Sequence, residues 1–98
     1  MKKTILVIEP DHDARVEIRQ TLEREGYLVV STANGTDAYN LLLEISQPSL
    51  ILLSCNPALL HRERFLARLG LSPSLNAIPV LHLLRTEDLK QVLIDRNF

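Results

Sequence analysis

The sequence has one cysteine, Cys55, among its 98 residues. A single thiol cannot close an intrachain disulfide and cannot build a metal site from several thiolates. The three histidines are scattered and show no metal-ligand spacing. These absences lead us to expect no metal, no cofactor and a reducing compartment, which for this chain means the cytoplasm.

The sequence also lacks an excess of charge of either sign and a long apolar run. It carries 11 Lys and Arg residues against 12 Asp and Glu residues, a net charge of −1, so it has no basic field to attract nucleic acids or anionic lipids. Its first apolar run, Ile5–Ile8, stops at Glu9 and Pro10, well short of a signal-peptide core or a membrane span. We therefore expect neither direct nucleic-acid binding nor membrane association.

What is present is the composition of an ordinary folded domain. Hydrophobic residues make up 46% of the chain and charged residues 23%, close to the averages for globular proteins. A chain of this length can bury one hydrophobic core but not two. We expect residues 1–98 to form a single domain, which excludes a multidomain enzyme.

Short apolar runs alternate with amphipathic segments along the chain. The runs are typical of strands buried on both faces, and the segments between them repeat apolar residues at helical spacing. Asp11 is placed to cap the first helix and Thr86 the last. The predicted strands are Ile5–Ile8, Tyr27–Val30, Leu50–Leu53 and Val80–Leu84.

Strands separated by helices of these lengths predict an α/β fold with a doubly wound parallel sheet. Ligands of such sheets bind at the carboxyl ends of the strands. The positions that should carry function are therefore the residues that follow the predicted strands, namely Glu9–Asp11, Ser54–Asn56 and Leu84–Arg85.

In this order of segments the sequence resembles the receiver domain of bacterial two-component response regulators. The resemblance implies a flavodoxin-like fold with strand order 2-1-3-4, apparently truncated to four strands and about four helices. It also implies a role in signalling by phosphoryl transfer from a histidine kinase. The residues that carry it are Ile5–Arg15, Leu22–Tyr27, Ala33–Ala38, Pro48–Leu53 and Ile78–Val80.

The positions that the family uses for chemistry are altered here. Glu9 keeps the first acidic position for Mg²⁺, but Pro10 replaces the second and offers no side-chain ligand. Ser54 stands at the phosphoacceptor position, where an alcohol without a neighbouring base is a poor nucleophile. Leu84 replaces the hydroxyl residue that meets the phosphoryl group. Asp11 could restore a carboxylate, although a helix cap is its commoner role.

We interpret these changes as a degenerate pocket and the chain as a pseudo-receiver that is not an enzyme. It would act in a two-component-type pathway by binding proteins without being phosphorylated. One alternative is a receiver that accepts a phosphoryl group at an atypical residue. Another is the regulatory fragment of a longer DNA-binding response regulator, although no basic recognition helix occurs in this sequence.

The resemblance also indicates that a fifth strand, which would cover the fourth, is missing with its helix. Val80–Leu84 would then be an apolar sheet edge with unpaired backbone groups, which proteins seldom leave bare. We expect it to be covered by a protein partner, by a second copy of the chain, or by the tail Val92–Phe98 folded back as a strand. The predicted partner surface comprises Val80, His82, Leu89, Val92 and Leu93.

Overall fold

The computed structural model describes residues 2–95 and confirms the predicted α/β fold. Within them, a four-stranded sheet has the order β2-β1-β3-β4, and every neighbouring pair of strands is parallel. This is the strand order 2-1-3-4 predicted from the sequence. The strands are β1 (Thr4–Ile8), β2 (Leu28–Thr32), β3 (Leu50–Ser54) and β4 (Val80–Leu83).

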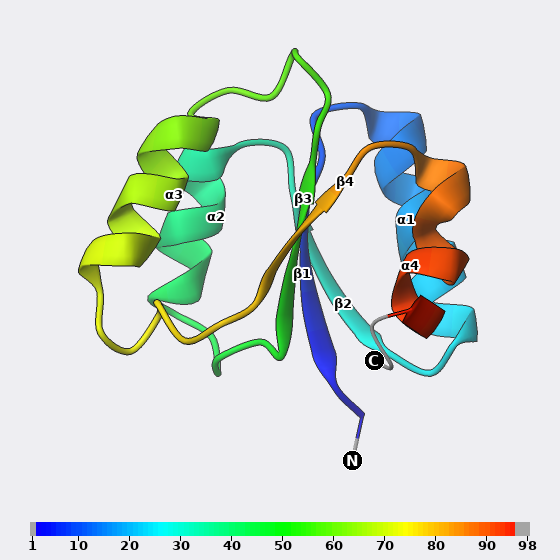
Figure 1. The fold of residues 1–98 in the computed structure, drawn as a ribbon, viewed down its shortest axis with the longest axis horizontal. Coiled ribbons are helices and arrows are strands. Elements are labelled where there is room, and N and C mark those ends of the chain that lie inside the picture. The colour runs from blue at the N-terminus through cyan, green and yellow to red at the C-terminus, as the bar shows by residue number, and fades with distance from the viewer. Residues whose placement is uncertain (1, 96–98) are drawn as a thin grey trace.

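Helices cover both faces of the sheet. Figure 1 views the sheet edge-on, with α2 and α3 on one side and α1 and α4 on the other. None of the helices in residues 2–95 is long and apolar enough to cross a membrane. The helices are α1 (His12–Arg24), α2 (Gly35–Leu42), α3 (Arg62–Leu71) and α4 (Leu89–Asp95), and a 3₁₀ turn, η1 (Thr86–Asp88), precedes α4.

Alternation along the strands divides the core into two layers. Leu6 and Ile8 of β1 pack toward α2 and α3, whereas Ile5 and Val7 pack toward α1 and α4. All four side chains are at most 1% exposed, because helices cover the central strand on both sides. This rigid centre fixes the residue that follows β1, and that residue is Glu9.

Two local predictions for the C-terminal part of the chain were wrong. Thr86 does not cap a helix with its side chain. It begins η1 after Arg85, and no side-chain cap bond forms there. Residues 92–95 belong to α4 and do not fold back as a strand, and the remainder of the predicted tail, residues 96–98, lies outside the described residues.

The predicted partner surface also needs correction at two residues. Leu89 and Leu93 are 1% and 6% exposed and pack against Ile18 and Leu22 of α1. They are unavailable to a partner because they form the buried face of α4. Val80 and Val92 are half-buried against the core, and His82 is exposed.

Helices α2 and α3 approach each other closely at Gly35. The Gly35 N–H donates to the carbonyl oxygen of Leu60 at 3.0 Å. A Cβ atom at this glycine would meet the carbonyl oxygen of His61 and would lie 2.9 Å from Cβ of Phe65. The contact therefore needs a residue without a side chain. His61 adopts a left-handed backbone conformation, with a φ of 63°.

We predict that Gly35→Ala lowers the free energy of unfolding by about 1–3 kcal/mol, because the added methyl group forces the two helices apart. Gly70→Ala is the matched control. Gly70 lies in α3 with nothing within 4 Å of the added Cβ, so this change should stabilise by up to about 1 kcal/mol through helix propensity. Urea denaturation followed by circular dichroism measures both, and equal effects would contradict the packing argument.

Candidate functional site

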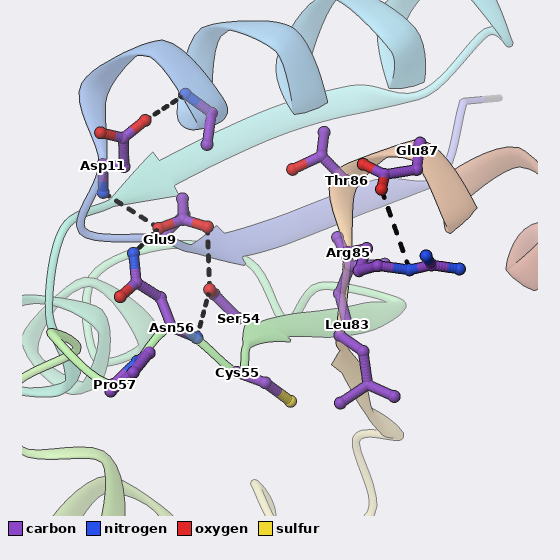
Figure 2. Close-up of a pocket in the computed structure, with 12 residues that line it drawn as sticks. Glu9, Asp11, Ser54, Cys55, Asn56, Pro57, Leu83, Arg85, Thr86 and Glu87 are labelled. Atoms are coloured by element: carbon purple, nitrogen blue, oxygen red, sulfur yellow. Dashed lines mark hydrogen bonds and ion pairs between the residues drawn. The ribbon is translucent and has the colours of Figure 1, made fainter.

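The ends of β1 and β3 bring Glu9 and Ser54 together, as predicted for residues that follow or end adjacent parallel strands. Ile8 pairs with Leu53 in the register of the two strands, so the next residues along each strand are neighbours. The Ser54 hydroxyl donates to Oε1 of Glu9 at 2.8 Å (Figure 2). Both residues are only 5% exposed.

The second oxygen of the Glu9 carboxylate is also bound by protein donors. Oε2 accepts from the backbone N–H of Asp11 at 3.0 Å and from Nδ2 of Asn56 at 3.3 Å. Hydrogen bonds to an ionised acceptor are stronger than neutral ones, and three of them here offset the burial of the charge. The carboxylate is held by the protein itself.

Ser54 also organises the loop that follows β3. Its Oγ accepts from the backbone N–H of Asn56 at 3.0 Å while its hydroxyl donates to Glu9. One side chain thus ties the loop to the neighbouring strand end. Figure 2 shows Glu9, Ser54 and Asn56 joined in one network, which we call the Glu9 network.

Asp11 acts as the helix cap that its position predicts. Its Oδ2 accepts from the backbone N–H of Ala14 at 2.8 Å at the start of α1. The Asp11 carboxylate is therefore committed to the helix and does not replace the acid lost at Pro10. Nη1 of Arg15 donates to the carbonyl oxygens of Glu9 at 2.9 Å and Pro10 at 3.3 Å and so fixes the loop between them.

The residues at the ends of β1 and β3 form one wall of the site, and the residues after β4 form the opposite wall. Together the two walls line a pocket of about 390 Å³. Leu84 is 80% exposed at its rim. Arg85 extends away from Glu9 in Figure 2 and pairs with Asp88 at 3.0 Å and Glu87 at 3.8 Å. The hydrogen bond and charge of Asp88, followed by the charge of Glu87, raise the pKa of Arg85.

The site offers little to a divalent cation. Across residues 2–95, no group of three or more His, Cys, Asp or Glu side chains is arranged to hold a metal ion. Mg²⁺ needs several oxygen ligands in an octahedron. In the pocket, the Glu9 carboxylate is bound by protein donors and the Asp11 carboxylate caps α1.

Sequence reasoning placed Glu9, Asp11, Ser54 and Asn56 at the strand ends but did not predict two of the contacts. Asn56 was among the positions expected to carry function, but the contact of its amide with Glu9 was not predicted. No role at the site was predicted for Arg15, yet it bonds the loop after β1. Arg15 lies six residues after Glu9, at the start of α1, and this spacing was the signal that could have indicated the contact.

Several solved structures that are similar to this chain are response regulators. The chemotaxis response regulator CheY4 of Vibrio cholerae is 19% identical and matches with a TM-score of 0.75 over 94% of this chain and 77% of its own. The phosphorylated cyanobacterial phytochrome response regulator RcpA is 25% identical, with a TM-score of 0.73 over 92% of this chain and 72% of its own. This chain has the receiver fold.

A third receiver structure agrees with this assignment of the fold. The signal receiver domain of a histidine kinase from Syntrophus aciditrophicus is 24% identical and matches with a TM-score of 0.71 over 93% of this chain and 70% of its own. No protein-family model and no curated protein sequence matches the chain.

We predict that Ser54→Ala destabilises the protein by about 1–3 kcal/mol, because it leaves Oε1 of Glu9 and the N–H of Asn56 without a partner in a buried site. Ser74→Ala is the control. Ser74 is exposed, and the change should alter stability by less than about 0.5 kcal/mol. Equilibrium urea unfolding compares the two variants, and a neutral Ser54→Ala would show that the Glu9 network contributes nothing.

Proposed function

We propose that this protein is a pseudo-receiver, a non-enzymatic module that acts by binding proteins of a two-component-type pathway without being phosphorylated. The observation that supports this most directly is the hydrogen bond between Ser54 and Glu9. At the carboxyl end of β3, where the resemblance locates an acceptor carboxylate, the chain has a buried alcohol bonded to the neighbouring acid.

The charge balance of the pocket argues against phosphorylation. A phosphoryl group on Ser54 Oγ would add negative charge beside Oε1 of Glu9, which lies 2.8 Å from Oγ. Two unit charges 4 Å apart near a protein surface repel by about 4 kcal/mol. In receivers, Mg²⁺ offsets such repulsion, but the carboxylates needed to hold it are lacking or committed here. RcpA, by contrast, was solved in a phosphorylated form.

One observation favours the alternative, a receiver that uses Ser54 as its acceptor. A carboxylate within hydrogen-bond distance is the kind of base that activates a hydroxyl nucleophile, and Glu9 meets this condition. The same pair is nevertheless buried, and Ser54 Oγ is also engaged with the N–H of Asn56. The phosphorylation experiment below decides between the two functions.

We predict that the protein gains no phosphoryl group on incubation with acetyl phosphate and Mg²⁺, because the acceptor and the metal ligands are lacking. Intact-mass spectrometry detects the added group directly. A receiver from the family that keeps the acceptor Asp, treated in parallel, confirms that the reagent is active. A mass gain that disappears in Ser54→Ala would contradict the proposal and support the Ser54 acceptor.

We further predict that restoring the missing acids restores metal binding. In the double variant Pro10→Asp/Ser54→Asp, two new carboxylates join Glu9 at the strand ends, and Mg²⁺ at 100 times its dissociation constant should stabilise the fold by about 2.7 kcal/mol. Pro10→Asp alone is the matched control. Thermal unfolding with and without Mg²⁺ measures the effect. An equal response in the wild type would show that its pocket already binds the ion.

A further inference from the structure

The position of α4 decides what can lie beside β4. From β1 to β2 the chain crosses over the face of the sheet that α1 covers. From β3 to β4 it moves in the opposite direction across the sheet, over the face that α3 covers. Both connections follow the right-handed rule, which holds in about 98% of parallel crossovers. Helix α4 lies with α1, on the face used to move toward β2 (Figure 1).

A right-handed crossover through α4 would therefore lead back toward the position already filled by β3. A further parallel strand at the outer edge of β4 would need its helix on the α2 and α3 face instead. The packing of Leu89 and Leu93 against α1 holds α4 on the opposite face. A strand that directly follows α4 would therefore not reach the outer edge of β4 by a right-handed crossover.

That edge presents unpaired backbone groups. On the β3 side, the carbonyl oxygens of Pro79 and Leu83 accept from Ile51 and Cys55 at 2.9 and 3.0 Å. Alternate residues of a parallel strand direct their backbone groups to opposite sides, so Val80, His82 and Leu84 direct theirs outward. Within residues 2–95, β4 is paired only with β3. In Figure 1, β4 is the strand nearest the viewer, with no helix in front of it.

The side chains of β4 itself lack the charges and prolines that prevent edge pairing. Proteins protect edge strands with Lys, Pro or a bulge, but Val80–Leu83 contains only apolar residues and one histidine. Leu84, directly after the strand, is 80% exposed. The net charge of −1 adds little repulsion between two copies.

We propose that β4 pairs with β4 of a second copy of this chain across a twofold axis at His82, which joins the two four-stranded sheets into one. A twofold axis requires antiparallel pairing and the same patch on both copies. His82 then exchanges two backbone hydrogen bonds with His82 of the second copy, and Val80 lies opposite its Leu84. The twofold axis generates two such pairs of Val80 and Leu84, and each covers the exposed surface of a leucine.

The dimer makes a second copy of the chain one of the protein partners of the pseudo-receiver. Only in this respect does it rest on the proposed function. The two are tested by different measurements. A chain that takes up no phosphoryl group but stays monomeric overturns the self-association alone, and a dimer that becomes phosphorylated overturns the proposed function alone.

The test uses the full chain in sedimentation or light-scattering measurements over a range of concentrations. The wild type should reach twice the 11.1 kDa mass of one chain. His82→Pro removes an outward N–H and no β3 bond, and it should weaken dimerisation at least about tenfold, the equivalent of 1.4 kcal/mol. Leu84→Lys should also weaken it, whereas Leu71→Lys, at a leucine of α3 that is 84% exposed, should not.

Hydrogen exchange at single amides provides a second readout that does not depend on the variants. The amides of Val80, His82 and Leu84 have no partner among the described residues of one chain and should become protected as the dimer forms. The amides of Leu81 and Leu83, which face β3, are protected in both states. A wild type that is monomeric at every concentration, or a dimer that keeps these three amides unprotected, would overturn the proposal.

Discussion

The structure of the site depends on one buried charge, the Glu9 carboxylate, and on the protein donors that hold it. An ionised group this close to the core is tolerated only when hydrogen bonds replace its water. Ser54, Asn56 and the backbone of Asp11 supply those bonds. They come from the ends of two strands, so the same contacts stabilise the fold and occupy the acid that a metal ion would otherwise use.

If the proposed function is right, this arrangement gives a physical reason why a receiver fold can persist without receiver chemistry. In such a fold the acids at the strand ends repel one another unless a cation binds, so loss of the metal would leave uncompensated charge. Replacing an acceptor acid by serine turns a repulsion into a hydrogen bond. On this proposal the pocket is part of the structural framework, and a signal would be transmitted through contacts elsewhere on the surface.

The sequence predicted the layers, the strand order and the meeting of Glu9 with Ser54, because all three follow from apolar periodicity, parallel topology and the resemblance. It did not predict that Asn56 would reach Glu9, since that depends on the path of the loop after β3. It also misassigned Leu89 and Leu93. Helical spacing shows that these leucines share a face, but not that α1 covers it. The start of the last helix was misplaced because a 3₁₀ turn precedes it.

The shared core of α1 and α4 has a consequence for how the chain can be shortened or lengthened. Ile18 and Leu22, near the N-terminus, are buried partly by residues from the last described helix. A gene product that stops before residue 89 would expose part of that apolar layer, because α1 would lose its neighbour α4 on this face of the sheet. The contact joins the two halves of the chain, and we expect added segments to be tolerated only at positions that leave it intact.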